Sequence, residues 1–462
     1  MAINRNFIVK QGIQVGGNLT VNNTLSSNTY ISNKGDVTSP PALLLDFTKG
    51  SIDPTVECTR SSNATYVAAN GNIIEVGPNV PRLNWDITTG ACLGLFSEEQ
   101  RINYTGYSDI EGAVGSPPRG MNAAGAFPYD YPVVSMDVWI GPNKQSAKHT
   151  RGVTNVSDDN VGYISSITPT VGNTYVATVY VYIPSTSTAT YVTLTWESGT
   201  VVLNPNVTAN ANMTIRDTWQ RITASGTMTS GSGFMVPVLR MGPIGAVCYT
   251  DCWQTEVGAY PTSWIPTTNV TSATRQDDIN FVSPITSFYN PTAGTFYGEI
   301  MPYWTGTATL TGTRNLLGFE DIQWVSNPVY SQVTSPTLFN GYALYLNPAS
   351  TANQFGIRDR YGSSIASQEI SPSPFQYIQA GSVYKFAGTQ HPTIATTVAL
   401  NGATLSNSNQ TIYRSAFQVN KMTIGYAFTG GAGPYQTCGY VRKIIYYPRV
   451  FSAAELAALT ET

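Results

Sequence analysis

The sequence predicts an all-β protein, with a short N-terminal β-helix-like peg followed by two antiparallel jelly-roll sandwiches. Three observations support this. Only 11% of the 462 residues are charged, against roughly 25% in ordinary soluble domains. Ser, Thr and Asn supply the polarity instead, which suits exposed strand faces. Short segments with a period of two recur between turn signals. A chain of this length predicts two or three domains, and we place the segments at 1–41, 42–275 and 280–462.

The first segment, 1–41, carries apolar residues at a six-residue spacing, which is a sign of β-helix rungs. A segment this short cannot bury a core by itself. We therefore expect it to wind with copies of itself, as a homotrimer, or to dock on another protein; a flexible polar leader is the alternative. The residues predicted to serve oligomerisation and anchoring are Ile13, Val15, Leu19, Val21 and Leu25.

The second segment holds the clearest strand of the chain, Tyr191–Glu197. Val192, Leu194 and Trp196 alternate with more polar residues, which is typical of a half-buried antiparallel strand. The stretch from Thr174 to Ile183 predicts a second strand, which Pro184 ends. Strands of this kind with such turns favour a sandwich.

The third segment predicts a hairpin and a terminal helix. Asn401-Gly402 fits a type I′ turn between two flanking strands, and 441–447 predicts another strand. Ser452 and Glu455 have the spacing of a capping box. The helix that they open should turn its leucines, at 456 and 459, toward the sandwich and cover a sheet edge.

Composition also excludes several classes of partner. The net charge is −3, so no basic face for nucleic acid is expected. No apolar run approaches the ~20 residues needed to cross a bilayer, and the N-terminus lacks a secretory signal. The protein is therefore expected to be made and assembled in a cytoplasm, without membrane insertion. The five cysteines have no metal-ligand spacing and are predicted to be buried free thiols.

The search for catalytic chemistry finds little. There are two histidines, and no His-Glu-x-x-His or Gly-x-Ser-x-Gly stretch. The acidic pairs are adjacent in sequence, so on a strand they point to opposite faces; we expect them in solvated turns. They are Glu98-Glu99, Asp158-Asp159, Asp277-Asp278 and Glu320-Asp321. We therefore expect no enzyme and no cofactor. Calcium is a possibility at Asp158 and Asp159, and a plain polar loop is the alternative.

Aromatic residues, including 28 Tyr and 8 Trp, offer surfaces for sugar rings, and Tyr adds a hydroxyl. Core packing or subunit contact is the alternative for each of them. Tyr342 and Tyr345 have opposite strand parity, so only one can face outward if they share a strand. The glycan-binding candidates are Trp304, Trp324, Tyr342, Tyr345, Tyr361 and Tyr435.

Several stretches resemble phage tail-fibre and virion proteins that carry a carbohydrate-binding-module-like jelly roll. In order along the chain they are Leu43–Phe47, Cys58–Tyr66, Pro81–Asp86, Gly94–Asn103 and Cys252–Pro266. The third segment is similar to concanavalin-like (laminin-G-type) sandwiches, at Asn401-Gly402 and Tyr446–Leu456. The opening, Phe7–Val21, resembles N-termini of virion proteins from phages of cyanobacteria.

The resemblance implies a virion fibre or spike subunit. Its N-terminus, residues 1–41, would attach to other virion proteins, and its outer domains would bind host-surface glycan weakly. Trimerisation would multiply such weak sites. One alternative is a capsid-decoration or tail structural protein without a ligand. Another is a polysaccharide depolymerase. The sequence argues against this alternative, because it shows no ready pair of carboxylates on one strand face.

Overall fold

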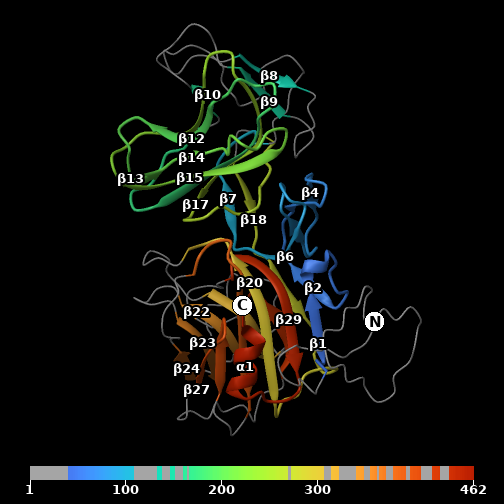
Figure 1. Ribbon diagram of the computed structural model, residues 1–462. Coiled ribbons are helices and arrows are strands. Elements are labelled where there is room, and N and C mark those ends of the chain that lie inside the picture. The colour runs from blue at the N-terminus through green and yellow to red at the C-terminus, as the bar shows by residue number, and fades with distance from the viewer. Residues whose placement is uncertain are drawn as a thin grey trace, which may run out of the picture. The chain divides into compact units, whose positions relative to one another are not determined.

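The all-β prediction is confirmed (Figure 1). The computed structural model describes residues 40–108, 133–137, 146–150, 160–163, 166–268, 272–305, 314–321, 340–347, 354–361, 364–370, 378–391, 396–406, 419–426 and 436–461. Within these ranges the chain forms antiparallel sheets, one α-helix and one short 3-10 helix, η1 (Phe47–Lys49). The predicted peg, with Ile13, Val15, Leu19, Val21 and Leu25, lies outside them.

Two sheets pack face to face in what we call the terminal sandwich. In order across the first sheet, the strands are β27 (Ala403–Ser406), β26 (Thr397–Leu400), β25 (Tyr384–Gln390), β20 (Gly294–Pro302), β29 (Gly439–Tyr447), β6 (Cys92–Ser97) and β5 (Leu83–Trp85), with β1 (Leu43–Asp46) also on β29. The second sheet comprises β2 (Val56–Thr59), β19 (Ile279–Val282), β28 (Val419–Ile424), β21 (Arg314–Asp321), β22 (Asn340–Asn347), β23 (Gln354–Tyr361) and β24 (Ser364–Ile370). Phe296 and Phe386 from one sheet meet Phe319 and Met422 from the other in a common core.

Strands from both ends of the described chain build this sandwich. Leu43 pairs with Tyr446, Leu95 pairs with Val441, and Val56 pairs with Val282. The expected division between 42–275 and 280–462 is therefore crossed by strand pairing. Apolar residues at sites such as Leu45 and Leu95 are fully buried in the core of the terminal sandwich.

A second pair of sheets forms the central sandwich, which has its own core. One sheet comprises β13 (Val202–Val207), β15 (Trp219–Ser230), β11 (Thr174–Tyr182), β17 (Val247–Val257), β9 (Ser146–Thr150) and β8 (Val133–Asp137). The other comprises β10 (Asn160–Tyr163), β16 (Met235–Gly242), β12 (Tyr191–Ser198) and β14 (Ala209–Asn210). The predicted apolar face of β12 is confirmed, because Val192, Leu194 and Trp196 are buried; on the other face Tyr191 is exposed but Thr195 is buried.

Two small pairs complete the fold. β3 (Ala64–Val67) and β4 (Ile73–Val76) form a hairpin. β7 (Arg101–Asn103) pairs with β18 (Ala273–Arg275), just before the chain enters the central sandwich and just after it leaves.

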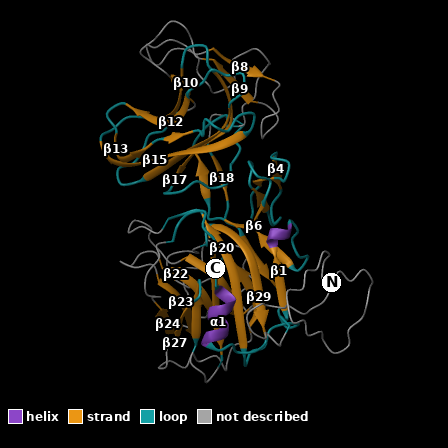
Figure 2. Ribbon diagram, in the orientation of Figure 1, coloured by secondary structure: helices purple, strands orange, loops and turns teal. Residues whose placement is uncertain are grey.

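The predicted turn and helix are confirmed. Asn401 and Gly402 have φ values of 46° and 83°, which a type I′ turn requires. Ser452 caps α1 (Ala453–Thr460) in a capping box with Glu455. The helix lies against β25, β26 and the edge strand β27 (Figure 2). Leu456 is fully buried and Leu459 is half-buried.

The cysteines are free, as predicted; four are buried and Cys92 is half-buried. Burial raises the pKa of Cys58 to about 12, so that its thiol stays protonated at neutral pH. Among the described residues, no helix is long and apolar enough to cross a membrane.

Candidate functional site

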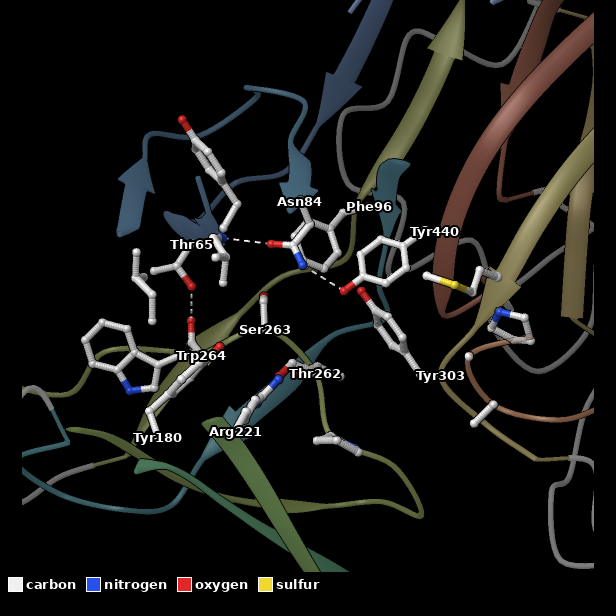
Figure 3. A pocket seen from close by; sticks show the side chains of 18 residues that line it. Thr65, Asn84, Phe96, Tyr180, Arg221, Thr262, Ser263, Trp264, Tyr303 and Tyr440 are labelled. Atoms are coloured by element: carbon white, nitrogen blue, oxygen red, sulfur yellow. Dashed lines mark hydrogen bonds between the residues drawn. The ribbon is translucent and has the colours of Figure 1, made fainter. Parts of the chain in front are cut away.

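A pocket of about 190 Å³ is the candidate site (Figure 3). Its wall includes residues from the β3–β4 hairpin, from β11 and β15 of the central sandwich, and from β20 and β29 of the terminal sandwich. The residues that line it are Thr65, Tyr66, Val67, Ile73, Asn84, Phe96, Tyr180, Arg221, Pro261, Thr262, Ser263, Trp264, Met301, Pro302, Tyr303, Ala380, Gly381 and Tyr440. The lining is therefore rich in aromatic rings with a small number of polar groups, which is typical of ligand sites.

Three rings form one side of the pocket. Tyr440 stands edge-on to Tyr303, with ring centroids 4.9 Å apart, and lies 5.2 Å from Phe96. Burial raises the pKa of both tyrosines, so both hydroxyls remain protonated and can donate hydrogen bonds. Across the pocket lie Tyr180 and Trp264 (Figure 3). The rings come from three parts of the fold that are far apart in sequence.

Asn84 holds two walls of the pocket in place. Its Oδ1 accepts a hydrogen bond from the backbone N–H of Val67 at 2.7 Å, and its Nδ2 donates to the Tyr440 hydroxyl at 2.8 Å. Thr65 Oγ1 donates to the carbonyl of Trp264. Figure 3 shows the Asn84 and Thr65 bonds as dashed lines. Since the amide of Asn84 is occupied, its role is to position the ring of Tyr440.

Arg221 is the one charged residue among those that line the pocket. Its Nη2 donates to the carbonyl of Thr262 at 2.6 Å and to Thr178 Oγ1 at 3.1 Å. Its guanidinium lies 5.6 Å from the ring centroid of Tyr180. Burial raises the pKa of Tyr180 to about 12, although Arg221 opposes this. Neither described partner of Arg221 is a carboxylate.

A buried ion network touches the pocket through Ser263. Arg82 Nη2 lies 3.0 Å from Glu98 Oε2 and 2.5 Å from Asp278 Oδ2, and Arg275 Nη1 lies 2.9 Å from Glu98 Oε2. Ser263 Oγ donates to Glu98 at 2.6 Å. Burial alone would raise the pKa of Glu98, but the Arg275 and Arg82 guanidiniums hold it below its usual value.

These carboxylates correct an expectation from the sequence. Glu98 and Asp278 were expected in solvated turns, and both are buried. Buried carboxylates are stable when they are paired and hydrogen-bonded, and the guanidiniums of Arg82, Arg275 and Arg60 supply that pairing. This pairing explains why Glu98 and Asp278 are buried, although each belongs to a pair of adjacent acids that was expected in solvent.

Of the glycan-binding candidates chosen from the sequence, Trp304 is the one whose side chain is described, and it does not line this pocket. It lies in the core of the terminal sandwich, where its Nε1 donates to the carbonyl of Thr437. Tyr342 and Tyr345 share β22, with opposite parity, and Tyr361 lies on β23. The remaining candidates lie outside the described residues: Trp324, Tyr435 and the possible calcium ligands Asp158 and Asp159.

Sequence reasoning missed the pocket residues, although a signal for them was present. The stretches quoted for the resemblance to phage virion proteins meet here. Thr65 and Tyr66 belong to one, Asn84 to the next, Phe96 to a third, and Trp264 to the last. Their convergence required the fold, because no spacing in the chain links residue 66 to residue 264.

No protein-family model matches the chain, and no curated protein matches it. Solved structures with some similarity include three. The CBM40 module of Ruminococcus gnavus IT-sialidase bound to α2,3-sialyllactose is 16% identical, with a TM-score of 0.27, over 37% of this chain and 83% of that chain. Tailspike protein 2 from Escherichia coli O157:H7 bacteriophage CAB120 is 17% identical, with a TM-score of 0.28, over 41% of this chain and 25% of that chain. The tandem CBM22 domain of Paenibacillus barcinonensis Xyn10C is 10% identical, with a TM-score of 0.25, over 76% of this chain and 99% of that chain. Because these scores are low, a function for this chain has to rest on its own residues.

Proposed function

We propose that this protein binds a glycan in the aromatic pocket, as a subunit of a phage virion fibre or spike. The observation that carries the proposal is the lining itself, in which rings from three parts of the fold surround a few fixed polar groups. Aromatic rings offer flat apolar faces to the C–H faces of a sugar, and tyrosine hydroxyls add hydrogen bonds. The pocket is smaller than the roughly 300–1,000 Å³ of a drug-sized site, which suits one sugar ring.

Binding without catalysis is part of this proposal. Glycoside hydrolysis commonly needs two carboxyl groups flanking one bond, and none of the described residues that line the pocket is Asp or Glu. Glu98 and Asp278, behind the pocket, are neutralised by guanidiniums. The virion role is supported by the resemblance of the sequence to phage fibre proteins. In that role residues 1–41 attach to the particle, and several copies, as a trimer, bind a host glycan with combined strength.

The test is binding of the purified protein to immobilised bacterial surface polysaccharides and to host cells, compared with Tyr303→Ala. Tyr303 lines the pocket and is half-buried, and its ring stands beside that of Tyr440, so the variant removes a ring from the pocket wall. We expect affinity to fall about tenfold, which corresponds to ~1.4 kcal/mol, because the sugar loses contact with one aromatic ring. Tyr104→Ala is the matched control, because Tyr104 is 37% exposed and does not line the pocket.

Three results would contradict the proposal. Equal binding by Tyr303→Ala and wild type would place the glycan elsewhere. No binding to any polysaccharide would favour a purely structural role. Reducing sugar released from a polysaccharide by the pure protein would make it a depolymerase. Mass spectrometry of purified particles tests the virion role separately.

A further inference from the structure

Arg221 stands out in the pocket because its charge is not matched by a carboxylate. It forms two hydrogen bonds, both through Nη2 and both to neutral oxygens, on Thr262 and Thr178. Nη1 and Nε donate to no group in the described part of the chain. A guanidinium carries five N–H donors, so several donors of this one remain for a ligand.

The other buried arginines of the region are used differently. Arg82 and Arg275 bind Glu98, and Arg60 binds Asp278. Each of these pairs satisfies a charge that would otherwise be costly to bury. Arg221 is half-buried, and its unmatched charge lies on the wall of a cavity rather than inside a core. A counter-ion supplied by a ligand would complete it in the same way.

The carboxylates behind the pocket do not neutralise Arg221, because other groups bind them. Glu98 and Asp278 pair with the guanidiniums of Arg60, Arg82 and Arg275. The buried carboxylate of Glu256 accepts hydrogen bonds from the backbone N–H and the hydroxyl of Thr262. The charge of Arg221 is therefore left for a ligand, and a partly buried charge is screened by salt less than an exposed one.

We propose that the pocket selects an acidic sugar, whose carboxylate binds the guanidinium of Arg221 while its ring lies among the tyrosines. This inference rests on the glycan-binding proposal and narrows it. One guanidinium matches the single charge of a carboxylate better than the charge of about −1.5 to −2 of a phosphate monoester. The free donors of Nη1 are suited to carboxylate oxygens, because hydrogen bonds between ionised groups are stronger than neutral ones.

The experiment begins with an array of acidic and neutral bacterial glycans. The best binder is then titrated in its native form and after chemical reduction of its carboxyl groups to alcohols. We expect the native form to bind about tenfold more tightly, as one charged contact predicts. The matched pair of ligands tests the charge in the wild-type protein, without any variant that could misfold.

Arg221→Gln then tests the residue, since glutamine keeps a polar side chain but carries no charge. We expect it to lose the preference for the native glycan and to keep its affinity for the reduced form. Arg240→Gln is the control, because Arg240 pairs with Glu197 at 3.1 Å and does not line the pocket. Thermal unfolding of each variant checks that it is folded, and Arg221→Lys, which keeps the charge, should restore the preference.

The outcomes separate the two proposals. If glycans bind through Tyr303 but reduction of the carboxyl groups changes nothing, the acidic-sugar assignment is wrong and glycan binding stands. The same holds if the binders carry only sulfate or phosphate. If no glycan binds, both proposals fail.

Discussion

Arg82 shows how single residues hold the site together. Its Nη1 donates to the carbonyl of Thr65 and, at 3.0 Å, to Ser263 Oγ, while Nη2 binds Glu98 and Asp278. Its guanidinium also lies 4.4 Å from the ring centroid of Phe96, which lines the pocket. One side chain thus links four distant segments of the chain and supports an aromatic wall. Removing one partner from such a buried pair is costly, because the other charge stays buried.

The pH dependence of stability should reveal the contribution of Glu99, a neighbouring half-buried carboxylate that binds two guanidiniums. Burial would raise the pKa of Glu99, but the Arg101 and Arg314 guanidiniums hold it at about 2, against 4.5 for an unperturbed glutamate. A carboxylate with a lowered folded-state pKa stabilises the protein above its unfolded-state pKa. That contribution should be complete above about pH 5 and be lost as the pH falls toward about 2.

The measurement is the thermal unfolding midpoint between about pH 6 and about pH 3, for wild type and Glu99→Gln. The variant lacks the ionised carboxylate, so its midpoint should fall less steeply with acid. Glu57→Gln, at an exposed position, should follow the wild-type curve. Identical slopes for wild type and Glu99→Gln would show that this carboxylate does not contribute to acid sensitivity.

At the scale of elements, the capping box of α1 gives the most local prediction. Ser452 Oγ accepts from the backbone N–H of Glu455 at 3.3 Å, and Glu455 Oε2 accepts from the backbone N–H of Ser452 at 2.7 Å. Ser452→Ala removes the cap and should lower stability by about 1 kcal/mol. Because α1 lies on β25, β26 and β27, amide exchange in these strands should rise with it. Ser452→Thr keeps a hydroxyl and is expected to remain close to wild type; a Thr variant as unstable as the Ala variant would rule out the cap as the cause.

Elements whose signal is local could be predicted from the sequence. The apolar face of Tyr191–Glu197, the Asn401-Gly402 turn and the Ser452 cap each lie within a few residues, and each was found in the structure. The pairing of Leu43 with Tyr446 has no such signal. It depends on which exposed strand edge remains free once the rest of the sheet has formed, and a strand of four residues fits many edges.

For the candidate site, the sequence predicted the types of residue but not their positions. Tyrosine and tryptophan were expected to carry glycan binding, and such rings do line the pocket. Candidates were sought within one expected domain, however, and the pocket draws on three parts of the fold. Trp304 illustrates the difficulty, since residue type alone does not distinguish a ring in the core from a ring at a surface.

At the scale of the whole molecule, the central sandwich is an insertion within the terminal sandwich. The chain leaves at Asn103 and returns at Ala273, and these residues are paired between β7 and β18. Strands before the insertion, including β1, β2 and β6, pair with strands after it. The two apolar cores are separate clusters. A boundary near residue 275 therefore marks the end of the insertion and not the beginning of an independent domain.

This arrangement predicts opposite results for two deletions. Replacing residues 104–272 by a short glycine-rich turn should leave a folded terminal sandwich, because paired ends can be joined without moving the strands. The ion network would survive, since Arg60, Arg82, Glu98, Arg275 and Asp278 all lie outside the deleted segment. Loss of Ser263 and of Tyr260, which packs in the core of the terminal sandwich, should lower stability. The variant should not bind glycan, because the pocket loses Tyr180, Arg221 and Trp264.

A fragment of residues 280–462 keeps an unbroken C-terminal chain but should not fold. It lacks β1, β2, β5 and β6, which leaves an edge of β29 unpaired and removes Leu45, Val56 and Leu95 from the core. Exposed strand edges with apolar neighbours favour aggregation. Size-exclusion chromatography and near-ultraviolet circular dichroism of both proteins would decide between the two architectures. The insertion model would be wrong if the 280–462 fragment were monodisperse and unfolded cooperatively while the protein lacking residues 104–272 aggregated. The boundary near 275 would then be the true domain boundary, because the C-terminal strands would form a core without the strands that precede Asn103.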